Sequence, residues 1–126
     1  MGIAFGKVGQ MERIMFKSKL HGATLTGTEL DYEGSITIDR DLLERTDMLP
    51  GEQVHVLNAN NGQRLVTYTI AGKAGSGEVV LNGPAARCGQ VGDKVIILSY
   101  GRFSDQQARA LRPKVVLVDE RNRPQE

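Results

Sequence analysis

Gly34 and Ser35 are the pair in this chain whose residue types could carry out chemistry. Ser35 opens an apolar alternating stretch, and Gly34 stands directly before it. Glycine permits backbone angles that other residues cannot adopt, so a serine hydroxyl after it can approach the preceding carbonyl. That geometry suits an N-to-O acyl shift, in which serine attacks the backbone that carries it. The same dipeptide recurs as Gly75-Ser76 inside a glycine-rich turn, so the dipeptide alone decides nothing.

A second group of polar residues follows one alternating segment, residues 64–70. Arg64 and Tyr68 share one face of the expected strand, and Thr67 takes the other. Arg64 is either a solvated edge residue or a fork for a carboxylate. Tyr68 is either a packing aromatic or a proton donor.

Other candidates have simple structural readings. We interpret Lys19 as a surface lysine and Asn82 as a turn residue before Gly83. Cys88 reads as a small core residue. The histidines, His21 and His55, are far apart in sequence and Cys88 has no cysteine partner, so no metal site is expected.

Two common catalytic motifs are missing from the sequence. No serine has the Gly-x-Ser-x-Gly spacing of a hydrolase elbow. The glycine-rich run 72–77 lacks the Gly-Lys-Ser/Thr ending of a phosphate-binding loop, and it is typical of a hairpin turn.

Composition favours one soluble globular domain. The chain has 126 residues, and this length is enough to bury a core without disulfides. Apolar residues make up 40% of it and charged residues 25%, as in an ordinary globular protein. The formal net charge of +1 favours neither nucleic acid nor an anionic membrane. With one cysteine and no apolar run long enough to span a bilayer, we expect a cytoplasmic protein. Residues 1–10 read as a loose N-terminal extension without the features of a signal peptide.

Short β-type patterns dominate the chain, and helical patterns are few. The Asn61-Gly62 pair predicts a tight hairpin between two strands. Asp39 and Ser104 are placed to cap short helices. We expect strands over 13–16, 23–28, 35–38, 53–58, 64–70, 78–81, 94–100 and 114–118, helices or helical turns over 40–46, 83–88 and 104–111, and a charged, frayed tail over 119–126.

The chain also contains an internal echo, because residues 50–57 match residues 91–98. Each copy is a glycine, an acid, one polar residue and then a strand, which makes Glu52 and Asp93 turn residues. Two such units imply pseudo-twofold symmetry, and many short strands favour a closed barrel without exposed edges. The alternative is coincidence, since Gly-acid turns before strands are common.

Taken together, these residues resemble the pyruvoyl-dependent aspartate 1-decarboxylase family, from Met11 to about Val118. The resemblance implies a mainly β fold, a six-stranded double-psi β-barrel with short helices over residues 11–118, and a homotetramer with sites at subunit interfaces. It also implies a role in pantothenate, and hence coenzyme A, biosynthesis. The motifs that carry it are Lys17-x-Lys19-Leu20-His21, Tyr32-x-Gly34-Ser35, Asn61-Gly62-x-Arg64-x-x-Thr67-Tyr68, Asn82-Gly83-x-Ala85-Ala86-x-Cys88 and Gly92-Asp93-x-Val95-Ile96-Ile97.

The resemblance further implies that the chain cuts itself between Gly34 and Ser35, giving a β chain 1–34 and an α chain 35–126. Ser35 then becomes a covalent pyruvoyl group, which forms a Schiff base with L-aspartate and yields β-alanine and carbon dioxide. Thr67 is the implied oxyanion donor and Tyr68 the implied proton donor. The implied substrate-binding residues are Lys19, Arg64, Thr67, Asn82, Gly83, Pro84 and Ala85.

Pro84 departs from the alanine that many family members have there, so any contact at that position must use its carbonyl or its ring. The sequence does not say whether a separate maturation factor is a partner. Two other functions stay open, a non-catalytic barrel that binds or assembles, and decarboxylation of another amino acid. Denaturing mass spectrometry separates the first from a self-cleaving enzyme, and a substrate panel tests the second.

Overall fold

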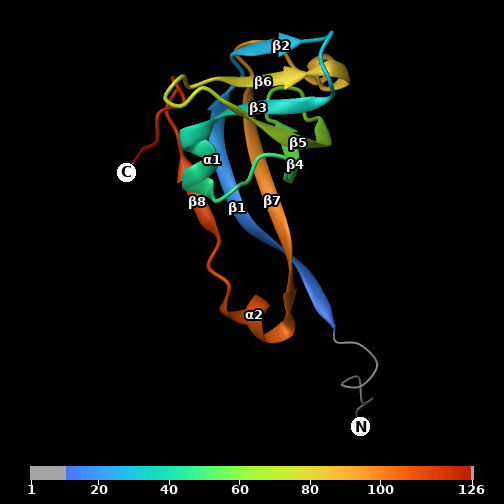
Figure 1. Ribbon diagram of the computed structural model, residues 1–126, viewed down its shortest axis with the longest axis vertical. Coiled ribbons are helices and arrows are strands. Elements are labelled where there is room, and N and C mark those ends of the chain that lie inside the picture. The colour runs from blue at the N-terminus through green and yellow to red at the C-terminus, as the bar shows by residue number, and fades with distance from the viewer. Residues whose placement is uncertain (1–10, 126) are drawn as a thin grey trace.

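The computed structural model describes residues 11–125, which fold into one eight-stranded sheet with three short helices (Figure 1). The strand order is β2-β6-β3-β5-β4-β7-β1-β8. In chain order the elements are β1 (Glu12–Thr24), β2 (Gly27–Glu29), β3 (Ser35–Asp39), α1 (Arg40–Thr46), β4 (Gln53–Asn58), β5 (Arg64–Gly72), β6 (Val79–Asn82), the 3-10 helix η1 (Gly83–Cys88), β7 (Lys94–Ser104), α2 (Asp105–Ala110) and β8 (Lys114–Leu117).

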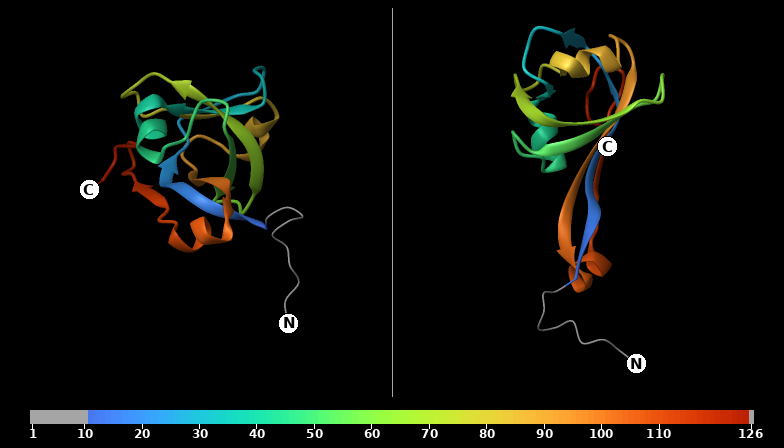
Figure 2. Two further views of the ribbon diagram at one scale, coloured as in Figure 1. Left: turned by 60° about the horizontal axis from the view of Figure 1, so that its bottom comes forward. Right: turned by 90° about the vertical axis from the view of Figure 1, so that its right-hand side faces the viewer.

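Strands β1 and β7 form a long antiparallel ladder that extends away from the rest of the sheet as a two-stranded arm (Figures 1 and 2). The ladder runs from the Glu12–Ser104 pair to the Thr24–Lys94 pair. Helix α2 lies at the far end of the arm, and β8 returns parallel to β1. The body of the protein therefore contains β2 to β6, while the arm contains the outer halves of β1 and β7.

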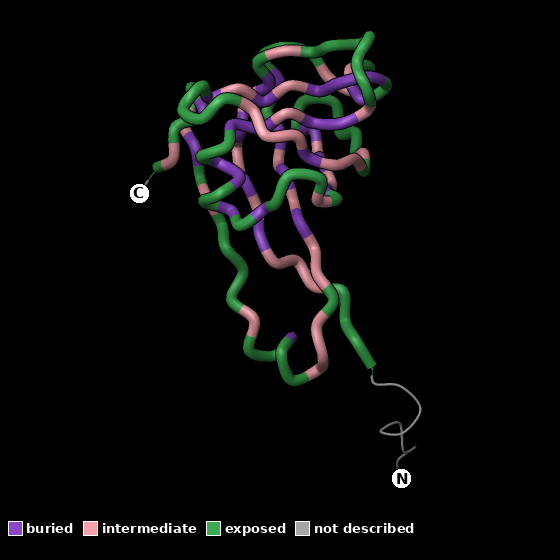
Figure 3. Tube along the Cα trace, viewed as in Figure 1, coloured by how far each residue is buried: buried purple, intermediate pink, exposed green. Residues whose placement is uncertain are grey.

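The core lies in the body, where Figure 3 shows most of the buried residues. Alternation on the short strands points every second side chain inward. On β3, Ile36 and Ile38 are buried in the core cluster, and Leu42 and Leu43 of α1 close over it. The whole cluster is Leu20, Ala23, Leu25, Ile36, Ile38, Leu42, Leu43, Met48, Val54, Val56, Val79, Leu81, Ala85, Val95, Ile97 and Val118.

The internal echo is a real structural equivalence. The carboxylate of Glu52 accepts a hydrogen bond from the Leu49 backbone N–H, and that of Asp93 accepts one from the Gln90 backbone N–H, so each acid closes a turn onto a residue three positions earlier. The strands that follow these turns, β4 and β7, pair antiparallel. The strands that precede the two units, β3 and β6, also pair antiparallel. Both relationships are those expected of a pseudo-twofold axis.

The six-stranded barrel implied by the family resemblance is wrong in its strand count, because residues 11–125 contain eight strands, the last of which the local pattern predicts over 114–118. One addition is β8, which pairs with β1 at the edge of the sheet. The other is β2, which the segment 25–26 separates from β1. There the chain changes partners, since the Leu25 N–H donates to the Asp93 carbonyl and the Thr26 N–H to the Val79 carbonyl. Closure of the sheet into a double-psi barrel stays a prediction.

The first strand also differs from expectation. Instead of separate strands over 13–16 and 23–28, β1 runs without a break from Glu12 to Thr24. Register shifts between Phe16 and Ser18, and again between His21 and Ala23, let the strand continue through residues that break the simple alternation.

Residues 119–125 are ordered against the body, so the expectation of a frayed tail is wrong for this segment. Asn122 is 1% exposed, and its side chain accepts from the Thr24 N–H and donates to the carbonyls of Thr24 and Gly77. Val118 and Pro124 form an isolated bridge. Residues 1–10, for which a loose extension was expected, lie outside the described residues.

Candidate active site

Ser35 opens β3 and lies directly opposite Asn82 of β6 across an antiparallel ladder. Both side chains are buried, at 0% and 1% exposure. The Ser35 hydroxyl donates to the Glu33 carbonyl over 3.0 Å and accepts a 3.0 Å hydrogen bond from the Asn82 amide. The same amide donates to the Thr37 hydroxyl over 2.9 Å. Ser35 is therefore fixed on both sides, as a positioned nucleophile must be.

Ser76 has a different environment. It is exposed, and its hydroxyl donates to the Lys73 carbonyl over 2.6 Å within a turn. The two Gly-Ser pairs thus have identical residues but different surroundings, and the buried partners distinguish Ser35.

Gly83, the first residue of η1, presses against the backbone before Ser35. Its φ of +63° is in the left-handed region, and a Cβ added there would lie 2.6 Å from the Tyr32 carbonyl oxygen and 2.7 Å from the Gly34 nitrogen. No real Cβ makes contacts that short, so only glycine fits. The backbone before Ser35 can therefore lie where it does only because residue 83 is a glycine and has no side chain.

A cavity of about 430 Å³ opens beside Gly34. It brings together five of the site residues predicted from sequence, which come from three separate segments of the chain. They are Gly34, Thr67 and Tyr68 of β5, and Pro84 and Ala85 of η1, with Leu65, Val66 and Cys88 completing the lining. Gly34, whose carbonyl Ser35 would attack, thus lines a space large enough for a small substrate.

Tyr68 donates a hydrogen bond from its phenol to the Glu33 carboxylate. This bond raises the pKa of Tyr68 above its ordinary value of 10.0, and burial and the charge of Glu33 act in the same direction. A phenol in this setting stays protonated at neutral pH and beyond, so it can serve as a proton donor.

Arg64 and Lys19 do not line the cavity beside Gly34. The Arg64 guanidinium lies 3.1 Å from Nδ1 of His55, and the His55 ring packs edge-on against Tyr100 at 4.8 Å between centroids. The Lys19 ammonium lies 5.8 Å from the centre of the Phe16 ring. Within one chain, the two proposed cations are therefore apart from the buried serine.

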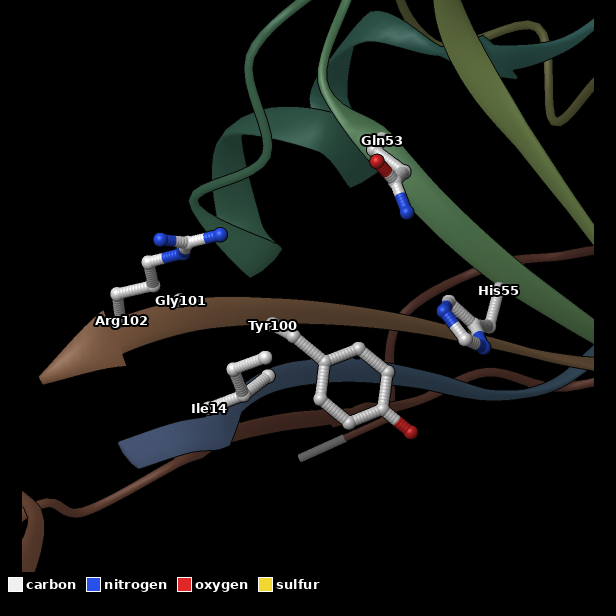
Figure 4. A pocket seen from close by; sticks show the side chains of 6 residues that line it. All are labelled: Ile14, Gln53, His55, Tyr100, Gly101 and Arg102. Atoms are coloured by element: carbon white, nitrogen blue, oxygen red, sulfur yellow. The ribbon is translucent and has the colours of Figure 1, made fainter. Parts of the chain in front are cut away.

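His55 and Tyr100 also line a second cavity, of about 530 Å³, at the point where the arm leaves the body (Figure 4). Its other lining residues are Ile14, Gln53, Gly101 and Arg102. None of its residues belongs to the constellation around Ser35, so this cavity is not the candidate active site.

Two residues that contact predicted site residues had no role assigned from sequence: Glu33, which contacts Tyr68, and His55, which contacts Arg64 away from the cavity beside Gly34. Glu33 gave one local signal, since it stands directly before Gly34, but its contact with Tyr68 joins residues far apart in the chain. His55 precedes Arg64 by nine positions across the β4–β5 hairpin, and the register of that hairpin was the only available signal.

Within residues 11–125, no three His, Cys, Asp or Glu side chains gather as metal ligands would. No helix in that part of the chain is long and apolar enough to cross a membrane.

Comparison with known proteins gives a consistent result. The family model described as aspartate decarboxylase matches residues 11–125. A protein named aspartate 1-decarboxylase from Desulfitobacterium hafniense is 59% identical over 90% of this chain and 90% of its own length. Proteins of the same name from Thermoanaerobacter pseudethanolicus and Listeria monocytogenes are both 54% identical, covering 90% and 89% of this chain and 97% and 88% of their own lengths.

Proposed function

This chain belongs to the aspartate decarboxylase family, and we propose that it converts L-aspartate to β-alanine and carbon dioxide with a pyruvoyl group made from its own Ser35. The observation that carries the proposal is the buried Ser35 hydroxyl, held between the Glu33 carbonyl and the Asn82 amide beside a cavity that Gly34 lines. The product supplies the β-alanine branch of pantothenate synthesis, and we place the enzyme in the cytoplasm.

The residues present fit the formation of such a group. In the first step the Ser35 oxygen bonds to the Gly34 carbonyl carbon, the peptide C–N bond breaks, and the hydroxyl proton passes to the nitrogen, which leaves an ester. Elimination then removes the α-proton of residue 35 and releases the Gly34 carboxylate. Water replaces the nitrogen, which leaves as ammonia, and a carbonyl remains at position 35.

The fold assists the first step through orientation and charge. Holding a nucleophile against its target is worth roughly 7–11 kcal/mol of barrier. Asn82 donates directly to the attacking oxygen, where negative charge develops as the proton leaves. Thr67 lines the same cavity as Gly34, and we assign its hydroxyl to the oxyanion that forms on the Gly34 carbonyl.

In the decarboxylation step the pyruvoyl group supplies an electron-accepting carbonyl. The chain's own residues bind the substrate and move the proton. Tyr68, with its raised pKa, donates the proton that replaces the departing carboxylate. Asn82, Gly83, Pro84 and Ala85 border the reacting position. Pro84 has no N–H, so it contributes its carbonyl or ring.

Aspartate has two carboxylates, and we assign Arg64 and Lys19 to them, with Arg64 the better bidentate partner. Because neither lines the cavity beside Gly34 within one chain, the proposal includes a homotetramer whose subunits share each site. In support, β5 presents Val66 at 54% exposure next to Arg64, and β8 presents the apolar residues Val115 and Leu117.

Denaturing mass spectrometry of the full-length chain tests the proposal. We expect masses for residues 1–34 and 35–126, the second lacking a free amino group at its N-terminus. Ser35→Ala should stay intact and inactive, and Tyr68→Phe should cleave but turn over aspartate poorly. A wild-type chain that stays whole after prolonged warm incubation would indicate a binding module, and a panel of amino acids separates aspartate from other substrates.

A further inference from the structure

Thr37 lies two residues after Ser35 on the same face of β3, and the two hydroxyls share one donor. The Asn82 amide nitrogen is 3.0 Å from the Ser35 oxygen and 2.9 Å from the Thr37 oxygen. The antiparallel ladder between β3 and β6 places Asn82 opposite Ser35 and its amide beside Thr37. Thr37 is half-buried and, with Asn82, borders a cavity of about 770 Å³.

The hydrogen-bond directions within this group are determined. The Ser35 hydroxyl donates its one hydrogen to the Glu33 carbonyl, so toward Asn82 it can only accept. The Asn82 nitrogen, not its oxygen, must therefore face Ser35. An amide nitrogen has two hydrogens, and Ser35 and Thr37 take one each.

We propose that Thr37 is a positioning residue, which holds the Asn82 amide so that one N–H stays directed at position 35. This inference rests on the proposed function, because it concerns the same site. Before cleavage, Thr37 fixes the rotamer through which Asn82 donates to the attacking oxygen. Without the Thr37 hydroxyl, one buried N–H loses its acceptor and the amide is free to rotate away from Ser35.

The role of Thr37 grows after cleavage. The Ser35 oxygen leaves with the Gly34 carboxylate, so Asn82 loses that acceptor. Among the hydrogen bonds of residues 11–125, Thr37 is then the one remaining acceptor for the Asn82 side-chain amide. The mature site therefore depends on Thr37 to keep the freed N–H facing residue 35.

Thr37 also has a purely structural alternative, in which a β-branched residue simply suits a strand. The two roles predict opposite results for two substitutions. Thr37→Val keeps the branched shape and removes the hydroxyl, whereas Thr37→Ser keeps the hydroxyl and removes the methyl. A positioning role makes valine the harmful change, and a packing role makes serine the harmful one.

The first test is the rate of self-cleavage, which denaturing mass spectrometry measures over time on freshly made full-length chains. We expect Thr37→Val to slow cleavage about tenfold, the effect of one lost hydrogen bond on a barrier, and Thr37→Ser to stay within about twofold of wild type. The matched control is Thr28→Val, the same change at an exposed threonine of β2. Equal rates for Thr37→Val and wild type, or slower cleavage by Thr37→Ser than by Thr37→Val, would overturn the proposal.

The second test does not depend on cleavage. In Ser35→Ala, which cannot cut itself, Thr37 is left as the acceptor for Asn82. We expect the Asn82 side-chain amide to exchange with deuterium at least about tenfold faster in Ser35→Ala/Thr37→Val than in Ser35→Ala, as read by NMR. Equal exchange contradicts the role of Thr37, whereas a wild-type chain that never cleaves contradicts the proposed function, so the two failures are distinct.

Discussion

The phenol of Tyr68 donates to the carboxylate of Glu33, two residues before Ser35. This contact joins β5, which carries the proposed proton donor, to the residues just before the proposed cleavage site. Gly34, between Glu33 and Ser35, lines the same cavity as Tyr68. The residues before the proposed scissile bond therefore help to raise the pKa of the residue that is proposed to act after cleavage.

Replacing Glu33 by Gln should lower the pKa of Tyr68 toward 10.0. The carboxylate hydrogen bond is the largest cause of the raised pKa, and it stabilises the protonated phenol. Tyrosinate absorbance, corrected with the matching Tyr68→Phe variant, measures the titration. The alkaline limit of decarboxylation should move to lower pH with it. Asp31→Asn removes the carboxylate two residues before Glu33, which does not act on the pKa of Tyr68, and an equal effect of that change would show that general charge, not the contact, matters.

Gly83→Ala should nearly abolish self-cleavage. The new Cβ would lie within 3.0 Å of the Tyr32 and Gly34 backbone, so the scissile peptide must move. We expect a loss of about 2–4 kcal/mol in the free energy of unfolding and at least about a hundredfold slower cleavage. The matched control is Gly62→Ala, at a φ of +76° with open space around its Cβ, which should cost only the backbone strain, about 1–2 kcal/mol. Urea titration and mass spectrometry measure the two effects, and cleavage at the wild-type rate would refute the steric argument.

Glu52→Gln should destabilise the protein near neutral pH but not in strong acid. Burial raises the pKa of Glu52, but hydrogen bonds from the Leu49 N–H, Lys17 and Ser99, with the charge of Lys17, outweigh it and the net pKa is lowered. Because the folded-state pKa lies below the ordinary 4.5, this stabilisation is present above pH 4.5 and is lost as pH falls through the folded-state value.

We expect a difference of about 1–2 kcal/mol in the free energy of unfolding at pH 7, from urea titrations of both proteins. The difference should shrink as pH falls below 4.5. A difference that is the same at pH 7 and pH 3 would mean that the side chain acts by shape and not by charge.

Asn122→Ala should cost about 2–4 kcal/mol in the free energy of unfolding. The side chain makes three hydrogen bonds, to Thr24 and Gly77, and its removal leaves buried backbone groups without partners. Asn122→Gly should cost nearly as much, although glycine suits the φ of +61° better. Glu120→Ala, at an exposed residue of the same segment, should cost little. An equal, small effect of all three changes would show that the tail does not stabilise the body.

The local patterns predicted the local structure well. The Asp39 cap on α1, the Ser104 capping box of α2 and a hairpin between β4 and β5 are confirmed, because each depends on residues close in sequence. The hairpin turn is longer than the tight Asn-Gly turn that was predicted, since residues 59–63 separate the two strands and Gly62 but not Asn61 has a positive φ. The tail was mispredicted for the opposite reason. Asn122 bonds to Thr24, 98 positions away, and a charged, apolar-poor segment gives no sign of such a partner.

The site was predictable to the same degree. The sequence motifs contain Gly34, Thr67, Tyr68, Pro84 and Ala85, which the fold brings to one cavity. The contact of Glu33 with Tyr68 could not be predicted, since it depends on how two distant segments meet. The local sequence pattern of one chain does not predict where Lys19 and Arg64 lie relative to a site that subunits are proposed to share. The roles of these two residues stay proposals.

The position of β1 in the sheet has a consequence for folding as well as for catalysis. Strand β1 lies between β7 and β8, so a cut after Gly34 would leave residues 12–24 clamped between two strands of the other fragment. The precursor folds as one molecule, whereas the cut product would have to reassemble from two. Its refolding after heating would then depend on protein concentration, and the mature enzyme would rely for its lifetime on slow unfolding.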